Sequence, residues 1–148
     1  LQAAPYIEEP FVVLNGDNVF VDGISESIDH TLDSYVDAAL LVGKATPAQA
    51  KQTGVVEVEN SQVTNVAEKP SKPKSQLVTT GCYVLNPEIF DAIQLLRPSE
   101  RGEYELTQAV NLLVLAGATV EAVRYEGQRV NVNTQSDIKT SERLLGCE

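Results

Sequence analysis

The sequence has no methionine, only two cysteines and no long apolar segment, and each absence excludes a class of protein. No run approaches the ~18 uninterrupted apolar residues of a membrane-spanning helix, and no signal peptide is visible. Cys82 and Cys147 lie far apart, which argues against a disulfide framework or a zinc site and makes a reducing cytoplasm the expected location. Because translation products normally begin with Met, the start at Leu1 predicts that these 148 residues are part of a longer protein.

Positive charge is also scarce. The chain has 11 Lys and Arg against 21 Asp and Glu, a formal net charge of −10, which argues against a general binder of nucleic acids or anionic membranes. Anionic substrates would need either a local concentration of these few cations or a metal ion. The 43% hydrophobic and 5% aromatic residues predict a largely aliphatic core, and the length suits a single domain spanning residues 1–148.

Short apolar runs alternate with segments of helical periodicity, and this alternation predicts a mixed α/β layer structure. Asn60-Ser61 between two valine-rich runs is typical of a β-hairpin turn. Thr134 is an expected helix N-cap, and Pro87 an expected first helical residue. We expect strands at 11–14, 38–42, 55–58, 62–66, 77–85, 120–125 and 130–133, and helices at 28–36, 87–96, 105–116 and 134–145.

The first candidate site motif is Leu14-Asn15-Gly16-Asp17, which follows the apolar run that starts at Phe11. Four apolar residues in a row suit a strand covered on both faces, as in a parallel sheet. Gly16 would let the chain bend and would leave Asp17 at the carboxyl end of the strand, where open α/β sheets bind ligands. A carboxylate there can hold Mg²⁺ against a substrate phosphate. An ordinary Asx-type turn is the alternative interpretation.

The second motif is Glu68-Lys69-Pro70. Pro70 should bias Lys69 toward extended backbone and so project its cation from the end of the hairpin strand. A lone lysine in a loop is usually solvated, but a neighbouring carboxylate and cation are what recognition of a phosphorylated sugar requires. In a third motif, Gly102-Glu103-Tyr104-Glu105, Glu105 suits the positive end of the following helix. Glu103 is then the better candidate for a substrate contact.

Together with further segments, these motifs occur in a recognisable order over nearly all of the chain. The order is Leu14-Asn15-Gly16-Asp17, Gly54-Val55-Val56, Glu68-Lys69-Pro70, Thr80-Gly81-Cys82-Tyr83-Val84, Pro87-Glu88-Ile89-Phe90, Gly102-Glu103-Tyr104-Glu105-Leu106-Thr107 and Val130-Asn131-Val132-Asn133-Thr134. The chain therefore resembles the sugar-1-phosphate nucleotidylyltransferases, the family of glucose-1-phosphate thymidylyl- and uridylyltransferases. The resemblance implies a Rossmann-like mixed sheet flanked by helices, the nucleotide-diphospho-sugar transferase fold, incomplete at its N-terminus.

The implied reaction joins a nucleoside triphosphate and a sugar 1-phosphate to give an NDP-sugar and pyrophosphate, with Mg²⁺ as cofactor. By matching position, the resemblance makes Asp17 the first Mg²⁺ ligand. Asn131 stands where most members carry a second metal-ligating Asp; its oxygen can still ligate Mg²⁺ but adds no charge. The remaining matches are substrate-binding: Lys69 at the sugar phosphate with Glu68 beside it, Gly54 close to the sugar, Thr79, Thr80 and Gly81 near the hexose, and Glu103 on the hexose.

The glycine-rich G-x-G-T-R-L signature of the family, which wraps the triphosphate, does not occur in these residues. We therefore expect this chain to carry the sugar half of the site and to be inactive alone. Its uncovered strand edge should favour a homo-oligomer or association with the missing N-terminal segment. A non-catalytic sugar-phosphate-binding or regulatory module is the alternative. A glycosyltransferase of related fold is weaker, because Asn18 and Val19 follow Asp17 in place of a D-x-D motif.

Overall fold

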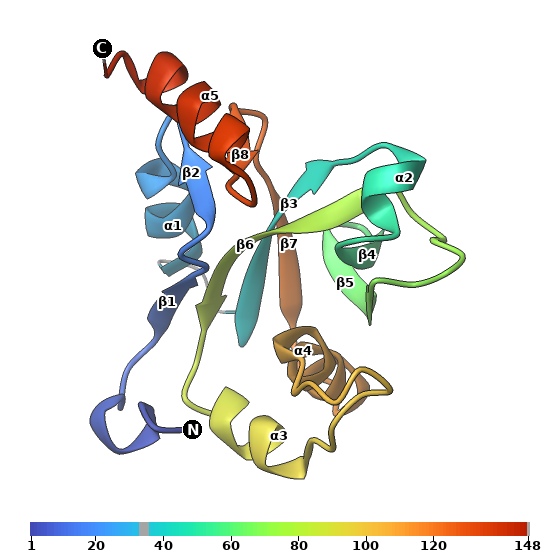
Figure 1. The fold of residues 1–148 in the computed structure, drawn as a ribbon. Coiled ribbons are helices and arrows are strands. Elements are labelled where there is room, and N and C mark those ends of the chain that lie inside the picture. The colour runs from blue at the N-terminus through green and yellow to red at the C-terminus, as the bar shows by residue number, and fades with distance from the viewer. Residues whose placement is uncertain (33–35, 148) are drawn as a thin grey trace.

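A six-stranded mixed sheet forms the centre of the structure, a computed structural model that describes residues 1–32 and 36–147 (Figure 1). Its strands follow the order β1-β6-β3-β7-β5-β4, and β4 also pairs with β6. The β3–β7 pair is parallel and the other pairs are antiparallel. The strands are β1 (Phe11–Leu14), β3 (Ala38–Lys44), β4 (Gly54–Glu59), β5 (Gln62–Glu68), β6 (Leu77–Leu85) and β7 (Val120–Arg124). The predicted mixed α/β class is confirmed.

A second, two-stranded sheet lies beside the first and pairs β2 (Asn18–Phe20) antiparallel with β8 (Arg129–Asn131). Sequence reasoning did not predict β2, because a three-residue strand has no periodicity to read. This small sheet brings the segment after β1 against the segment after β7. It therefore joins two motifs that lie more than a hundred residues apart in the chain.

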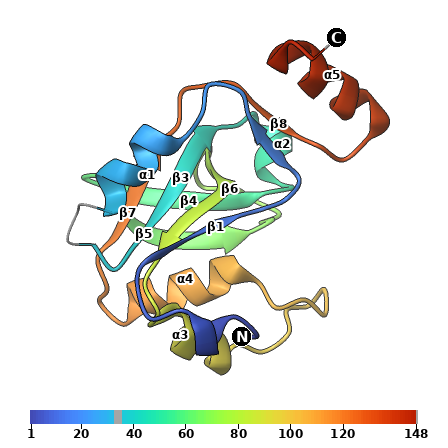
Figure 2. The same ribbon diagram turned by 90° about the vertical axis from the view of Figure 1, so that its left-hand side faces the viewer.

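The helices flank the central sheet. They are the 3₁₀ helix η1 (Ala4–Tyr6) and the α-helices α1 (Ser25–Leu32), α2 (Pro47–Ala50), α3 (Ile89–Leu95), α4 (Leu106–Leu115) and α5 (Gln135–Leu145). Figure 2 shows α3 and α4 together on one side of the sheet, whereas α5 extends away from it. The predicted helix at 28–36 is observed as α1 as far as Leu32; residues 33–35 lie outside the described part of the chain, and Val36 is not helical.

The main core lies between the sheet and the pair α3 and α4. Its buried side chains come from β3, β4, β5, β6 and β7 and from both helices, among them Leu40, Leu85, Ile89 and Val110. Phe11 and Phe90 stack at its margin with ring centroids 5.5 Å apart. As the composition predicted, this core is mainly aliphatic. It fixes the strands whose ends form the site.

Local sequence signals explain the turns and caps. Asn60 and Ser61 adopt positive φ angles of 50° and 68°, as a tight two-residue hairpin turn requires, and confirm the predicted hairpin. Thr134 and Asp137 form a reciprocal capping box at the start of α5, confirming the predicted N-cap. Pro87 lies two residues before α3, which starts at Ile89, so its predicted place as first helical residue is wrong.

The expectation that β1 is covered on both faces is also wrong. Its side chains alternate between half-buried and exposed, and Val12 and Leu14 are 39% and 49% exposed. Within the described residues β1 pairs only with β6, so it is an edge strand with one open side.

None of the helices in this described part combines the length and apolar character needed to cross a bilayer.

Candidate functional site

A polar cleft of about 1100 Å³ opens where the ends of the central strands meet the small β2–β8 sheet. Segments from β3, β4, β5, β6, β8, α4 and the loop after β1 contribute to its wall. Of the residues predicted for the site, the lining includes Asp17, Gly54, Glu68, Lys69, Thr79, Thr80, Gly81 and Asn131. Residues from distant motifs are thus brought to one place. Glu103 is not part of this lining.

The charges in the cleft differ from those of the whole chain. Four of the 11 basic residues line it, together with four acids: Lys44, Lys51, Lys69, Arg129, Asp17, Glu68, Glu105 and Asp137. The cleft is therefore formally neutral in a chain of net charge −10. This is the local concentration of cations that binding an anionic substrate to an acidic protein requires.

Asp17 lies at one end of the cleft, where backbone pairing holds it beside β8. Its carbonyl oxygen accepts a hydrogen bond of 2.7 Å from the Val132 N–H, and its neighbour Asn18 is directly opposite Asn131. The Asn18 side-chain amide donates to Asp17 Oδ1 at 2.7 Å. Because β2 pairs with β8, the backbone of Asp17 lies next to the strand that carries Asn131, and both residues line the cleft.

These two side chains fit a magnesium ion that substrate phosphates help to bind. A carboxylate and an amide oxygen are hard ligands of the kind Mg²⁺ takes, and it typically binds through one or two carboxylates plus phosphate and water. Among the residues that the structure describes, no group of three or more His, Cys, Asp and Glu side chains is arranged to hold a metal. One carboxylate and one amide oxygen are donor types that would suit an ion shared with substrate.

Gly81, in the middle of β6, makes room for this end of the cleft. Its φ angle is +82°, which strongly favours glycine, and a Cβ there would lie 2.7 Å from Asn18 Nδ2. The Asn15 N–H donates to the Gly81 carbonyl at 2.8 Å, so the loop after β1 lies directly against β6. A side chain at position 81 would push this loop, and Asp17 with it, out of place.

Glu68 ends β5 and Lys69 follows it on another wall of the cleft, with Lys69 Nζ 4.0 Å from Glu68 Oε1. The Lys69 side chain is 43% exposed and that of Glu68 16%. The predicted extended backbone at Lys69 is wrong, because its φ angle is +44°. The chain turns there as the Lys69 N–H donates to the Thr53 carbonyl at 3.1 Å, and this contact overrides the preference set by Pro70.

Gly54 is the tightest point of the same wall. A Cβ at this position would lie 2.9 Å from Thr107 Cγ2, 3.0 Å from Thr79 Oγ1 and 3.1 Å from Glu68 Oε2. Thr107 Oγ1 donates to Glu68 Oε2 at 3.0 Å and fixes that carboxylate. Only a residue without a side chain permits β4, β6 and α4 to approach this closely.

Of the two glutamates before α4, only Glu105 lines the cleft. Glu103 is 63% exposed with its carboxylate 3.8 Å from Arg101 Nε, outside the cleft lining. Glu105 is buried and lines the cleft, where Ser99 and Arg101 both donate to its Oε1. Glu105 is the N-cap residue of α4 and so lies at the positive end of that helix, as expected, although its side chain makes no cap hydrogen bond.

Two further lining residues were missed by sequence reasoning. Tyr83 lies in the cleft wall on β6, and burial raises the pKa of its hydroxyl. Arg129 begins β8, two residues before Asn131 and therefore on the same face of that strand. A basic residue at this spacing is a signal that was available in the sequence. The tyrosine was hidden in an apolar run that reads as core.

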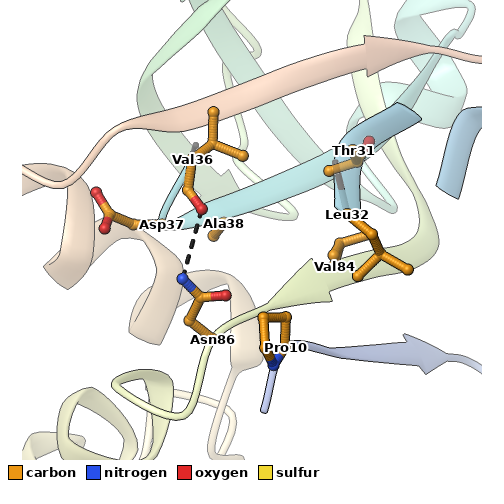
Figure 3. Close-up of a pocket in the computed structure, with 8 residues that line it drawn as sticks. All are labelled: Pro10, Thr31, Leu32, Val36, Asp37, Ala38, Val84 and Asn86. Carbon is orange, nitrogen blue, oxygen red and sulfur yellow. Dashed lines mark hydrogen bonds between the residues drawn. The ribbon is translucent and has the colours of Figure 1, made fainter. Parts of the chain in front are cut away.

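A second hollow of about 320 Å³, shown in Figure 3, lies apart from these residues. Among the described residues that line it, Asp37 alone is charged, and its carboxylate accepts a hydrogen bond from the Thr119 N–H at 2.7 Å. Asn86 Nδ2 donates to the Val36 carbonyl at 3.4 Å. Asp37 and Asn86 are engaged with the backbone, and the described lining residues include no cation for a phosphate.

Comparison with known proteins now decides the family. A family model described as "Nucleotidyl transferase" matches residues 2–129. The chain belongs to the nucleotidyl transferase family. This confirms the resemblance that the order of motifs indicated.

Relatives of this nucleotidyl transferase chain include a UTP–glucose-1-phosphate uridylyltransferase of Haloferax volcanii, 36% identical over 98% of the chain and 60% of the relative. A glucose-1-phosphate thymidylyltransferase of Streptomyces griseus is 32% identical over 93% of the chain and 39% of the relative. The UTP-bound UGPase of Acinetobacter baumannii superposes with a TM-score of 0.78 at 26% identity, covering 97% of the chain and 53% of that structure. The chain thus spans about 40 to 60% of the length of these proteins.

Proposed function

We propose that residues 1–148 form one domain, the sugar-phosphate-binding part of a sugar-1-phosphate nucleotidylyltransferase. In this reaction a phosphate oxygen of the sugar 1-phosphate attacks the α-phosphorus of a nucleoside triphosphate, an NDP-sugar forms and pyrophosphate leaves. The observation that carries the proposal is the single cleft lined by both Asp17 and Lys69. The names of the relatives, a uridylyltransferase and a thymidylyltransferase acting on glucose 1-phosphate, support it.

Each side chain has a role in this proposal. Lys69 holds the sugar phosphate, and Glu68, fixed by Thr107, accepts hydrogen bonds from sugar hydroxyls. Gly54 lets the backbone of β4 approach the hexose, and Thr79, Thr80 and Gly81 form the surface beside it. Catalysis then rests on alignment and charge neutralisation, because the protein forms no covalent bond.

Asp17 and Asn131 would hold Mg²⁺. Bound there, the ion would neutralise the negative charge of the reacting phosphates. Because Asn131 adds no charge, affinity for the ion should be lower than with two carboxylates. Asn131→Asp should therefore bind Mg²⁺ more tightly in a calorimetric titration of the complete protein. Unchanged affinity would remove Asn131 from the ligand set.

The kinetic test replaces the proposed phosphate-binding lysine. Lys69→Ala in the complete protein should raise the KM for sugar 1-phosphate far more than the KM for nucleotide, measured by pyrophosphate release. Lys72→Ala is the matched control, because Lys72 is an exposed lysine of the same loop that does not line the cleft. Equal effects of Lys69→Ala on both KM values would exclude the role. Binding of sugar 1-phosphate without turnover in the complete protein would instead indicate a regulatory module.

The open edge of β1 supports a further part of the proposal. Exposed Val12 and Leu14 lie on a strand with one free side, which favours pairing with a segment of the same protein or with another copy. Native mass spectrometry should show an oligomer or a bound N-terminal segment; a uniform monomer would contradict this.

Both cysteines are free, which supports a reducing cytoplasm as the location; recovery in an extracytoplasmic cell fraction would contradict it.

A further inference from the structure

Arg129 occupies a fixed position next to Asp17 that neither the motifs nor the proposed mechanism uses. Its Nη1 donates to the Thr80 carbonyl at 3.1 Å and to Asn18 Oδ1. One acceptor belongs to β6 and the other to β2, so the guanidinium is anchored between the two sheets. Arg129 itself is half-buried and lines the cleft. A long side chain held in this way has already lost most of its conformational freedom.

Asn18 separates the charges of Arg129 and Asp17. It accepts from Arg129 through Oδ1 and donates to Asp17 Oδ1 through Nδ2. This amide orientation is the required one, because a guanidinium only donates and a carboxylate only accepts. No ion pair joins Arg129 to Asp17 among the residues that the structure describes. Each charge is thus oriented by the amide, and neither is neutralised by direct contact with the other.

Most of the guanidinium remains available to a ligand. Of its five N–H groups, the two on Nη1 are used; the others have no hydrogen-bond partner in the described part of the chain. Burial lowers the pKa of Arg129 and the Asp17 charge opposes that shift, but a guanidinium stays protonated at neutral pH. Its planar fork matches phosphate oxygens in a bidentate arrangement. The face of β8 therefore presents one cation and one neutral amide, Asn131.

We propose that Arg129 is a phosphate-binding residue of this cleft, donating from the free part of its guanidinium to the phosphate of a sugar 1-phosphate beside Asp17. The inference rests on the proposed function and deepens it. Arg129 supplies positive charge near Asp17, the one carboxylate of the proposed metal site. Binding of the phosphorylated sugar should consequently persist without a divalent cation.

The test is titration of glucose 1-phosphate into the 148-residue chain in EDTA, followed by NMR. Arg129→Gln should raise the dissociation constant about 10-fold or more, the size expected for losing a charge-assisted hydrogen bond. Arg129→Lys should fall between wild type and Arg129→Gln, because an ammonium keeps the charge but lacks the fork. The matched control is Arg124→Gln, which removes the same charge from an exposed residue outside the cleft lining. It should stay within about twofold, because an exposed charge away from the ligand is largely screened.

A second readout separates phosphate contact from a structural role. The affinity of the wild type should fall with added NaCl more steeply than that of Arg129→Gln, because one charge pair with the ligand is lost. Equal salt slopes, or equal affinities of Arg129→Gln and Arg124→Gln, would overturn the inference and leave the proposed function in place. If Arg129→Gln fails to fold, Arg129→Lys with wild-type affinity would equally overturn it. Failure of the wild-type chain to bind glucose 1-phosphate would contradict the proposed function itself.

Discussion

Replacing Gly54 with alanine places a methyl group where the structure leaves no room. The new Cβ would lie 2.9 Å from Thr107 Cγ2 and 3.0 Å from Thr79 Oγ1, both closer than ordinary van der Waals contact. All the neighbours are side chains of a packed wall, so relief requires either a rotamer change of Thr107 or a shift of β4. Overpacking of this kind lowers the free energy of unfolding by about 1–3 kcal/mol. For a chain of this size that corresponds to a fall in Tm of roughly 2–12 °C.

Calorimetric or circular-dichroism melting measures this effect, and a second strand glycine provides the matched control. A Cβ at Gly43 would meet Thr80 Cγ2 at 3.5 Å and the Tyr125 carbonyl at 4.0 Å, which are ordinary contacts. Gly43→Ala should therefore leave Tm unchanged or slightly raised, because alanine reduces the entropy of the unfolded chain. The two substitutions add the same methyl group and differ only in their surroundings.

A double variant identifies the contact responsible. Thr107→Ser removes Cγ2 but keeps the hydroxyl that donates to Glu68 Oε2 at 3.0 Å. In the Gly54→Ala background it should therefore recover part of the lost Tm, whereas alone it should destabilise modestly by deleting a buried methyl. The steric reasoning would be refuted if Gly54→Ala melted at the temperature of Gly43→Ala, or if Thr107→Ser merely added its own loss.

Three further predictions follow from single groups. Hydrogen bonds from Thr134 and the backbone lower the pKa of Asp137 below its ordinary 3.8. The ionised Asp137 therefore stabilises α5 above pH 3.8, and this stabilisation should be lost as the pH falls through the lowered pKa. Amide exchange in α5 should show the loss, and Asp137→Asn should abolish the pH dependence. Burial raises the pKa of Cys82 to about 11. At pH 8, iodoacetamide should therefore label only the exposed Cys147 until denaturant is added. Labelling of both cysteines in the folded protein, detected by mass spectrometry, would contradict this prediction. Because Lys69 has a positive φ, the Lys69→Gly variant should be about 1 kcal/mol more stable to unfolding than Lys69→Ala. Both variants should lose the same affinity for the sugar phosphate. Equal melting temperatures of the two variants would argue against backbone strain at this position.

Much of the fold was predictable because its signals are local. The hairpin turn at Asn60-Ser61 and the capping box at Thr134 each depend on a few adjacent residues, and both appear where the sequence places them. The apolar runs of β3 and β6 were recognised for the same reason, since burial selects aliphatic residues. The short strand β2 was missed because three residues have no pattern of their own, and its existence depends on β8.

The candidate site divides in the same way. Asp17 and Lys69 stood out because a turn and a proline mark them in the sequence, and the structure places both in one cleft. The sequence favoured Glu103 over Glu105, but only Glu105 lines the cleft, because Ser99 and Arg101 hold its carboxylate there. Arg129 was overlooked although its spacing from Asn131 was a local signal; its anchoring depends on partners on β2 and β6 that are remote in sequence.

The sequence by itself determined the α/β class, the family and the residue types available for phosphate and metal binding, because turns, caps and apolar runs act over a few residues. Only the tertiary structure decided that Lys69 adopts a positive φ, that β1 lies at an edge of the sheet and that Asn18 stands between Arg129 and Asp17. Those features arise from contacts between segments far apart in the chain, and such contacts override local preference when they satisfy buried backbone groups and exclude competing packing.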